Sequence, residues 1–481
     1  MTSPFRFTKI VATIGPSTEE YENLKKAIES GVDVCRLNFS HGTHEDHKKR
    51  FDNIRRIEKE LGKKIPVLGD TQGPKLRVGN FEGGMAMLAD GQDFIFDSDD
   101  KLGDSTRVKL PHPEVLKSLD IGHLVLIDDG KLKVQITEKG NGFVKAKVIV
   151  GGKIKDHKGF NLPNTIVPLP ILTEKDLDDL EFMLGPDMGV DLVAVSFAQT
   201  PDDLRKAKEV IAGRAPMVTK VEKPTAAIDY LPEIIELSDV VMIARGDMGV
   251  EVGPEKVPAI QKRMIKLCRE KRKPVIVATQ MLESMIDGAF PTRAEVTDVA
   301  NAVYEGTDCT MLSAESASGK YPFEAISTMA KIIREVESDP AYRCYVKNYN
   351  SDLTGNTIGD AMSLATSDIV KETGAKAVVA YTTSGTSVIN ISKHRPAAPI
   401  IAITTNAKVA GKMGCAWGVI PKVIESESHA DNVDDAVRAV VAKEGLAKPG
   451  ELVVVSFAKG TAPAKDIFTH GATTLISVVK V

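Results

Sequence analysis

Eight short apolar segments alternate with longer amphipathic segments, and this alternation constrains the fold more than any other feature of the sequence. Each apolar segment has the length and continuous hydrophobicity of a buried parallel strand, and helical patterns, as in residues 19–30 and 255–271, separate most of them. Eight such units predict an α/β fold of the (β/α)8-barrel type. An open doubly wound sheet is less favoured, because no GxGxxG turn follows the first segment. The predicted strands are residues 9–15, 33–39, 66–72, 191–197, 215–222, 239–244, 274–280 and 308–314.

The alternation is interrupted once, between the third and fourth predicted strands. Residues 74–168 contain short alternating segments and many Gly and Asp turn signals, which predict a small β-barrel domain inserted in a barrel loop. Without it, residues 1–73 and 169–343 have about the 250 residues that are typical of such a barrel. Residues 347–357 have the composition of a linker, and helix–strand alternation over residues 344–481 predicts a C-terminal α/β domain.

The composition excludes several classes of protein. The chain has 62 Lys and Arg against 66 Asp and Glu, and a net charge of −4 does not favour a general nucleic-acid or anionic-membrane surface. No apolar run approaches the roughly 18 residues of a membrane span, and the N-terminus lacks the apolar core of a signal peptide. The 5 cysteines form no CxxC pair. We therefore expect a reduced, cytoplasmic protein without structural zinc.

Polar side chains cluster where the predicted barrel strands end. The active site of such a barrel is built at the C-terminal ends of its strands. Some polar residues are expected wherever a strand enters a loop, but six of the eight ends are rich in charged and hydroxyl groups. These ends are residues 36–42, 69–77, 220–222, 244–249, 278–282 and 313–316.

Two of these ends carry the groups expected of a metal centre. Lys220 and Glu222 are two residues apart on one strand, so their side chains point to the same face. A buried structural Lys–Glu pair is one interpretation. The other is a metal-binding carboxylate beside a cation, with Asp247 on the next strand as the second carboxylate, a set that suits Mg²⁺ or Mn²⁺. Gly246 and Gly249 permit an anionic ligand to approach the backbone closely.

Two arginines at adjacent strand ends point to a phosphorylated substrate. Arg36 and Arg77 carry guanidinium groups that can bind phosphate with two hydrogen bonds each. Together with Lys220 and the predicted metal site they indicate phosphoryl transfer, which depends on positioning and charge neutralisation. The chain contains neither a Walker GxxxxGK[ST] motif nor the protein-kinase motifs.

Several longer motifs closely resemble the pyruvate kinase family, in the family's order of barrel, inserted domain, resumed barrel and C-terminal domain. The resemblance implies transfer of a phosphoryl group from phosphoenolpyruvate to ADP, giving pyruvate and ATP. It also implies Mg²⁺ or Mn²⁺ as cofactor, a homotetramer, an allosteric C-terminal domain, and an inserted domain that acts as a lid and excludes water. The matching motifs are residues 8–17, 36–42, 70–77, 158–163, 244–251 and 278–303.

The resemblance assigns roles to the residues of the barrel. Glu222 and Asp247 match the ligands of the divalent metal, and Lys220 matches the cation that neutralises the phosphoryl group and the enolate. Arg36 matches the position that binds the phosphate. The remaining matches are Gly246, Asp247 and Thr279 around the substrate carboxylate, with Thr279 also in proton transfer to the enolate, and Arg77, His41 and Lys158 around the nucleotide.

One motif departs from the family in a way that predicts a difference in cation requirement. The usual members bind K⁺ through positions that match Asn38, Ser40, Asp70 and Thr71, and their next motif reads DTKGPE. This chain reads DTQGPK, so Lys75 replaces a glutamate and Gln72 a lysine, and Val78 stands where threonine is common. Two cations 4 Å apart repel by about 4 kcal/mol at an effective dielectric constant of 20. We therefore expect Lys75 to substitute for K⁺, and the chain to need Mg²⁺ or Mn²⁺ but no K⁺.

A loop of the C-terminal domain is a candidate site for a phosphorylated effector. It follows a predicted strand, and its N–H groups and hydroxyls can surround a phosphate, although an ordinary strand–helix turn would look the same. The loop has no arginine, and residues 456–466 depart from the family's glycine-rich closing loop, so we do not expect fructose 1,6-bisphosphate as the effector. Ala198, Gln199 and Ser318 also depart from the family pattern. The effector loop consists of Thr382, Thr383, Ser384, Gly385, Thr386 and Ser387.

Two other functions remain open from the sequence. A metal-dependent aldolase or lyase that acts on pyruvate enolates could share Lys220, Glu222 and Asp247, but it would not need Arg36, Arg77 and a lid. A non-enzymatic sugar-phosphate sensor is less favoured, because it would not need the complete set of cations and carboxylates. ATP formation from phosphoenolpyruvate and ADP would distinguish the three.

Overall fold

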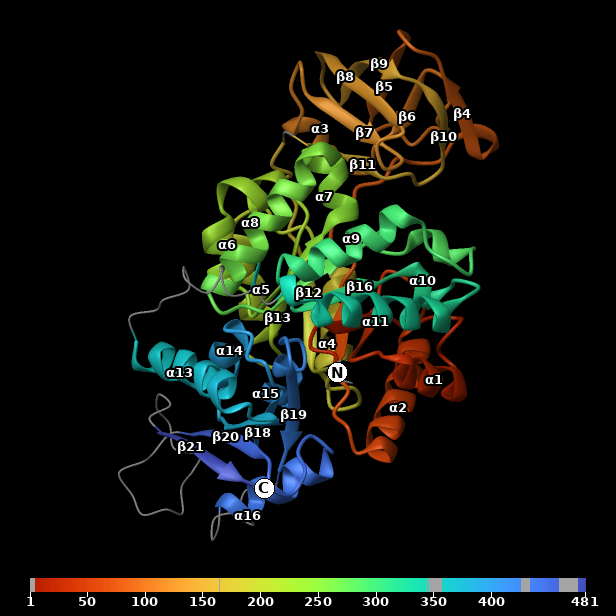
Figure 1. Ribbon diagram of the computed structural model, residues 1–481. Helices are drawn as coiled ribbons and strands as arrows, with labels where there is room; N and C mark the ends of the chain where they lie inside the picture. The colour runs from red at the N-terminus through yellow and green to blue at the C-terminus, as the bar shows by residue number, and fades with distance from the viewer. Residues whose placement is uncertain (1–4, 164, 343, 346–356, 425–432, 458–474) are drawn as a thin grey trace.

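Eight parallel strands form a closed barrel in the order β1-β16-β15-β14-β13-β12-β3-β2 (Figure 1). The computed structural model describes residues 5–163, 165–342, 344–345, 357–424, 433–457 and 475–481. All eight strands lie within the predicted segments, which confirms the (β/α)8 barrel. They are β1 (Lys9–Thr13), β2 (Val34–Asn38), β3 (Val67–Asp70), β12 (Leu192–Val195), β13 (Met217–Val221), β14 (Val240–Ala244), β15 (Val275–Ala278) and β16 (Cys309–Leu312).

Helices surround the barrel and bury one apolar face each against the strands (Figure 1). Four of them begin with a capping box, in which a threonine hydroxyl and an acidic side chain three residues later satisfy each other's backbone N–H groups, at Thr43, Thr173, Thr200 and Thr292. The short helix α7 (Arg245–Val252) lies directly after β14 at the C-terminal end of the barrel. The others are α1 (Tyr21–Ser30), α2 (His44–Leu61), α4 (Glu174–Leu184), α5 (Pro201–Ile211), α6 (Leu231–Leu237), α8 (Val257–Glu270), α9 (Arg293–Tyr304), α10 (Ala314–Ala317) and α11 (Pro322–Ser338).

The inserted domain lies between β3 and β12 and forms the lid at one end of the molecule (Figure 1). The predicted small β-barrel consists of a six-stranded sheet, β11-β7-β8-β9-β5-β6, and a two-stranded sheet, β10-β4, that share one core of their own. Phe94 and Phe96 pack edge to face in this core, with ring centroids 5.2 Å apart. The elements are β4 (Met85–Leu88), β5 (Asp93–Asp97), β6 (Arg107–Lys109), α3 (Pro113–Ser118), β7 (Leu124–Ile127), β8 (Leu132–Lys139), β9 (Phe143–Val150), β10 (Gly152–Lys155) and β11 (Phe160–Asn161).

The C-terminal domain is a five-stranded sheet in the order β19-β18-β17-β20-β21, with only β21 antiparallel. This is the α/β arrangement that the sequence predicted. Residues 347–356 of the predicted linker lie outside the described residues. The elements are α13 (Ile358–Thr373), β17 (Ala377–Tyr381), α14 (Thr386–Lys393), β18 (Ile400–Thr404), α15 (Ala407–Met413), β19 (Val419–Val423), α16 (Val433–Lys443), β20 (Leu452–Phe457) and β21 (Leu475–Lys480).

The C-terminal domain packs against the end of the barrel where the strands begin. Cys415 is fully buried within the barrel's interior core, and its carbonyl oxygen lies 3.1 Å from Cys309 Sγ at the start of β16. Asp308 accepts hydrogen bonds from Arg395 Nη1 at 2.9 Å and from the Trp417 backbone N–H at 3.1 Å. The C-terminal domain therefore closes this end of the barrel, while the lid lies beyond the opposite end.

Candidate active site

Arg36, Asp70 and Lys220 meet at the C-terminal end of the barrel because β2, β3 and β13 end there. Arg36 donates from Nε to Asp70 Oδ2 at 2.7 Å and from Nη1 to Thr13 Oγ1 at 2.8 Å. Lys220 Nζ lies 3.5 Å from Asp70 Oδ1, and Asp70 is fully buried. Asp70 thus contacts both cations, and the Arg36 guanidinium keeps further N–H donors for an anionic ligand.

Lys220 and Glu222 lie on the same face, as their spacing predicted, with Nζ and Oε1 3.1 Å apart. Burial alone would lower the pKa of Lys220, but the Asp70 and Glu222 carboxylates outweigh it and raise the pKa above its ordinary value. Burial raises the pKa of Glu222 to about 7, and the Asp247 carboxylate adds to this, although Lys220 opposes it. The site therefore keeps its ammonium charged but leaves its carboxylates incompletely compensated.

The donor set around Glu222 fits a divalent cation. Oε1 of Glu222 and Oδ1 of Asp70 are buried and receive no well-directed hydrogen bond from the residues that the structure describes. The Lys220 ammonium approaches both oxygens, at 3.1 and 3.5 Å, but it is one positive charge shared between two buried carboxylates, so a further cation would be favoured there. Glu222 and Asp247 are close enough for one to raise the pKa of the other, and both offer the oxygen ligands that Mg²⁺ and Mn²⁺ prefer.

Thr279 and Gly246 form a strained contact beside these carboxylates. The Gly246 N–H donates to Thr279 Oγ1 at 2.7 Å, and this hydroxyl donates to the Ala278 carbonyl at 2.6 Å. Thr279 has φ of 71° and Gln280 φ of 53°, a left-handed conformation that a β-branched residue rarely adopts. Such strain is characteristic of functional sites. A Cβ atom on Gly246 would lie 3.4 Å from the Thr279 hydroxyl oxygen, so the two residues are in close contact.

Lys75 contacts one of the predicted metal ligands. Its Nζ donates to Asp247 Oδ1 at 3.1 Å, and the two side chains are 28% and 29% exposed. Lys75 belongs to the first of the two segments that join the lid to the barrel. The side chain is therefore directed toward the carboxylates rather than into solvent.

The four positions that match the family's K⁺ ligands surround the end of β3. Asn38 Oδ1 accepts from the Ser40 N–H at 3.2 Å, and the Thr71 hydroxyl donates to the backbone of β12 at 3.0 Å. Asp70 is engaged by Arg36. Lys75 takes part in none of these contacts, since its Nζ pairs with Asp247 instead.

The predicted nucleotide-binding residues lie around the central cluster rather than in it. Arg77 is exposed and donates from Nη1 to the His157 carbonyl at 2.9 Å. Lys158 Nζ pairs with Asp128 Oδ1 at 2.8 Å within the lid. His41 is exposed in the turn between β2 and α2. A nucleotide would have to draw these side chains from their present partners.

A cleft separates the lid from the barrel. It has a volume of about 1020 Å³, within the size range of ligand sites. Gly246 and Asp247 line it from the barrel, Lys75 from the first connection, and Leu126 and Lys133 from the lid. Two of the predicted substrate-binding residues, Gly246 and Asp247, thus open into the space between two domains, whereas Arg36, Lys220 and Thr279 do not line it.

The predicted effector loop lies in the C-terminal domain before α14. The Gly385 N–H donates to Thr382 Oγ1 at 2.9 Å, and Ser384 Oγ donates to Thr386 Oγ1 at 3.0 Å. Gly385 has φ of 82°, which glycine adopts without strain. The hydroxyls of the loop therefore close a compact turn at the helix start. Most of the closing segment, residues 458–466, lies outside the described residues.

Sequence reasoning missed several groups that shape the site. Ser196 Oγ accepts from Lys220 Nζ at 2.8 Å, and the Phe197 N–H donates to Glu222 Oε2 at 2.6 Å. Phe197 has φ of 58°, and no sequence pattern predicts this for a phenylalanine. The position of the SF pair at the end of the predicted strand 191–197 was the only available signal. Gln199, noted as a departure from the family, binds the backbone of Val167 through both amide atoms.

One further group of potential metal ligands lies between α2 and α4. His44, Asp178 and Asp179 bring their ligand atoms within 4.8 Å of one another. Lys175 Nζ already pairs with Asp179 at 2.6 Å, and His44 stacks on Phe182 with centroids 4.1 Å apart. These contacts explain the cluster without a metal ion, because they hold α2 and α4 against each other.

The fold and the site together define a (β/α)8-barrel enzyme with an inserted β domain, whose centre brings the cations of Arg36 and Lys220 together with the carboxylates of Asp70 and Glu222. Comparison with known proteins agrees. Residues 5–326 match the family model of the pyruvate kinase barrel domain, and residues 360–467 match that of the pyruvate kinase alpha/beta domain. The chain belongs to the pyruvate kinase family.

Individual relatives support this assignment over nearly the whole chain. A pyruvate kinase of Methylorubrum extorquens is 46% identical over 450 residues, covering 94% of this chain and 93% of that protein. A pyruvate kinase of Clostridium perfringens is 40% identical, covering 93% and 95%. The crystal structure of a pyruvate kinase from Cryptosporidium parvum superimposes with a TM-score of 0.90 at 35% identity, covering 99% and 96%. Among the described residues, no helix is both long and apolar enough to cross a bilayer.

Proposed function

We propose that this phosphotransferase transfers the phosphoryl group of phosphoenolpyruvate to ADP with Mg²⁺ or Mn²⁺ and without a requirement for K⁺. Family membership supplies the reaction and the need for a divalent metal. One observation supports the residue roles. Arg36 and Lys220 both form ion pairs with Asp70, beside the carboxylates of Glu222 and Asp247. Two cations and two metal-binding carboxylates at one end of the barrel suit a phosphorylated, carboxylate-bearing substrate.

Each group has a defined task in this proposal. Arg36 binds the phosphate, and Lys220 neutralises the charge on the phosphoryl group during transfer and on the enolate that remains. Glu222 and Asp247 hold the divalent ion, which supplies further charge neutralisation. The Lys220 ammonium is suited to its task because its raised pKa keeps it charged throughout the ordinary pH range.

The substrate carboxylate would bind the backbone at the start of α7. Gly246 and Asp247 lie in the first turn of this helix, where N–H groups favour an anion. The Thr279 hydroxyl fixes this turn through the Gly246 N–H and is positioned to take part in proton transfer to the enolate. Closure of the lid over the cleft would exclude water, which would otherwise compete with ADP for the phosphoryl group.

The nucleotide would bind at the edge of the site, around the cluster of Arg36, Asp70 and Lys220. Arg77 and Lys158 belong to the inserted domain and its first connection, whereas His41 lies in the barrel turn after β2, so their convergence on ADP would require lid movement. The Lys158–Asp128 pair would have to open for this, and an anionic phosphate is a suitable replacement for the Asp128 carboxylate.

The potassium independence depends on Lys75. Its ammonium pairs with the Asp247 carboxylate. The site therefore carries one positive charge at a position where the usual family members have a glutamate. We further propose a homotetramer, a cytoplasmic location and a phosphorylated effector at the loop of residues 382–387. These three rest on resemblance to the family.

One assay tests the central proposal. ATP and pyruvate formation is measured from phosphoenolpyruvate and ADP with Mg²⁺, in a buffer free of K⁺ and Na⁺ and with a bulky organic cation for ionic strength. We expect turnover that depends on both substrates and on the divalent ion. Retro-aldol cleavage of 2-keto acids without ATP formation would instead support the aldolase, a function that the family comparisons do not favour.

A further inference from the structure

The two segments that join the lid to the barrel both contact helix α7. The first segment places Lys75 Nζ on Asp247 Oδ1. The second contains β11, from which Asn161 Nδ2 donates to Glu251 Oε1 at 2.9 Å. Asp247 and Glu251 are four residues apart on α7 and therefore lie on one side of it. A single helix thus receives a polar contact from each connection.

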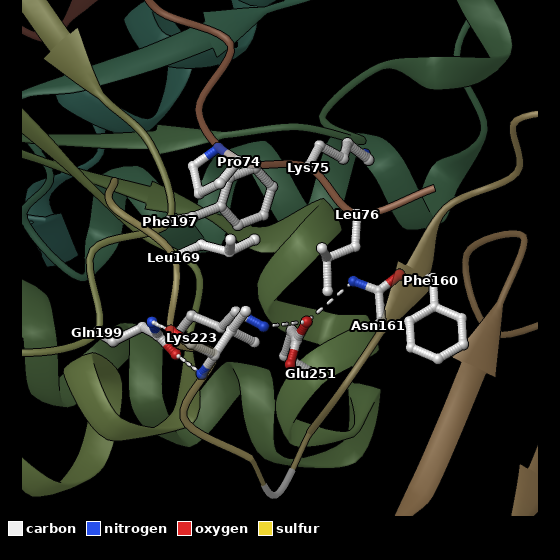
Figure 2. A pocket seen from close by; sticks show the side chains of 11 residues that line it. Pro74, Lys75, Leu76, Phe160, Asn161, Leu169, Phe197, Gln199, Lys223 and Glu251 are labelled. Atoms are coloured by element: carbon white, nitrogen blue, oxygen red, sulfur yellow. Dashed lines mark hydrogen bonds and ion pairs between the residues drawn. The ribbon is translucent and has the colours of Figure 1, made fainter. Parts of the chain in front are cut away.

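Glu251 is the centre of a buried polar cluster at this junction (Figure 2). Its Oε1 accepts from Lys223 Nζ at 2.8 Å as well as from Asn161, and its side chain is fully buried. Its Oε2 is buried and has no hydrogen-bond partner among the described residues. A buried carboxylate is held only at a cost unless its partners stay in place, so movement of Asn161 or Lys223 directly affects Glu251.

The cluster connects the two segments that carry the predicted metal ligands. Lys223 directly follows Glu222 at the end of β13, and Glu251 follows Asp247 by one helical turn. The Lys223–Glu251 pair therefore fixes the distance between β13 and α7 close to both ligands. Asn161 adds the lid to this connection, because its backbone pairs with Leu126 in the lid sheet.

The surroundings of the cluster are tightly packed. Figure 2 shows the apolar side chains of Leu76, Leu169 and Phe197 around it, and the cavity they line has a volume of only about 20 Å³. Gln199 holds the second connection separately, accepting from the Val167 N–H at 2.8 Å and donating to the Val167 carbonyl at 2.9 Å. The connection is thus held at Asn161 and again at Val167, so a lid movement that shifts this connection acts on the contact between Asn161 and Glu251.

We propose that Glu251 is a positioning residue that, through Lys223 and Asn161, couples the position of the lid to the geometry of the divalent-metal site. This inference rests on the proposed metal role of Glu222 and Asp247. Coupling between two sites is reciprocal. The lid contact at Asn161 therefore increases metal affinity, and metal binding in turn stabilises the lid contact.

The first test measures Mn²⁺ affinity by electron paramagnetic resonance without substrates. Asn161→Leu keeps the volume of the side chain but removes its hydrogen bond to Glu251. We expect its dissociation constant for Mn²⁺ to rise by about tenfold, the lower end of the effect of outer-sphere groups on metal affinity. Glu251→Gln should give a similar or larger rise, because Lys223 then lacks its counter-ion. A change of less than twofold in Asn161→Leu would overturn the proposal.

A matched control separates positioning from stability. Lys393 and Asp360 form an equally buried ion pair in the C-terminal domain, 2.6 Å apart. Asp360→Asn should lower the unfolding midpoint as Glu251→Gln does but leave Mn²⁺ affinity unchanged. If Asp360→Asn weakened Mn²⁺ binding to the same degree, the effect would be one of general stability and the coupling would be refuted. Glu222→Gln tests the underlying assignment, because normal Mn²⁺ affinity in that variant would refute the metal site itself.

The second test measures the coupling from the other side. Amide hydrogen exchange at Phe160 and Asn161 is followed with and without Mn²⁺. We expect Mn²⁺ to slow exchange there in the parent and not in Asn161→Leu. Equal exchange with and without Mn²⁺ in the parent would contradict the proposal, even if Asn161→Leu weakened metal binding.

Discussion

Lys75 Nζ lies 3.1 Å from Oδ1 of Asp247, so the residue that replaces the family's usual glutamate is paired with a carboxylate predicted to hold the divalent metal. Both side chains are more than two-thirds buried. An ammonium in this place adds positive charge to a centre that already contains Arg36 and Lys220. A monovalent cation bound nearby would have to overcome repulsion from all three.

The first prediction is that K⁺ does not activate the parent and that Lys75→Glu creates a K⁺ requirement. The substitution replaces a cation with a carboxylate close to Asp247, and the resulting repulsion favours an additional cation. Initial rates with and without K⁺ should differ by about tenfold or more in Lys75→Glu. Lys75→Met is the control, since it removes the contact with Asp247 without adding a carboxylate. Activation of the parent by K⁺ to the same extent would refute the proposal.

The second prediction concerns Lys220→Met. The substitution removes the ammonium 3.1 Å from Glu222, and the lost charge acts mainly on the transition state. We expect kcat to fall by about 100- to 1000-fold while the KM for phosphoenolpyruvate and the affinity for Mn²⁺ change little. Steady-state kinetics and Mn²⁺ titration check both expectations. Near-normal kcat would rule out the assigned role.

The third prediction uses the strain at Thr279. Thr279→Ser keeps the hydroxyl that accepts from the Gly246 N–H but removes the β-branch that disfavours φ of 71°. We expect it to retain most activity and to unfold at a slightly higher temperature. Thr279→Val keeps the shape but leaves the Gly246 N–H without its acceptor, so kcat should fall. Calorimetry and kinetics distinguish the two, and equal activity in both variants would show that the hydroxyl is dispensable.

The fourth prediction addresses the effector loop. Ser384→Asp places a carboxylate beside the N–H groups before α14, where it would repel a phosphate. We expect it to abolish any activation by sugar phosphates without changing the rate in their absence. Ser384→Asn is the neutral control. An effector screen with parent and variant gives the answer, and an unchanged response in Ser384→Asp would exclude the loop as a phosphate site.

The fifth prediction concerns acid stability. Burial, with a contribution from Arg50, lowers the pKa of His47 from 6.5 to about 4, so the folded state favours the neutral ring. The stability contribution of His47 is complete above pH 6.5 and is lost as the pH falls towards 4. Between pH 7 and pH 5 the unfolding midpoint of the parent should fall further than that of His47→Gln. His112→Gln, at a half-buried histidine of the lid, provides the control for the loss of one histidine ring elsewhere in the chain.

The barrel could be predicted because its strands are buried on both faces and therefore appear as continuous apolar runs. The lid strands that could not be predicted lack such runs. β4, β10 and β11 have four, four and two residues and lie at the edges of small sheets, so neither length nor alternation marks them. The helix α3 has six residues and likewise carries too little periodicity.

The central residues of the site could be predicted because their relative positions follow from short spacings along one strand. Lys220 and Glu222 share a face by spacing alone. The contact between Lys75 and Asp247 joins residues 172 positions apart, and only the folded chain brings them together. The left-handed Phe197 and the cluster around Glu251 were not predictable, since they depend on three segments that meet at the lid junction.

The burial of Cys415 within the barrel core has a consequence for how the chain can be divided. The lid has a hydrophobic core of its own, so the barrel would keep its interior covered without it. The C-terminal domain, by contrast, supplies part of the barrel's floor, and its removal would expose apolar strand residues such as Val34 and Met311 to water. We therefore expect the barrel and the C-terminal domain to unfold together. In the course of evolution the lid could be gained or lost as a module, whereas the C-terminal domain could only change together with the barrel.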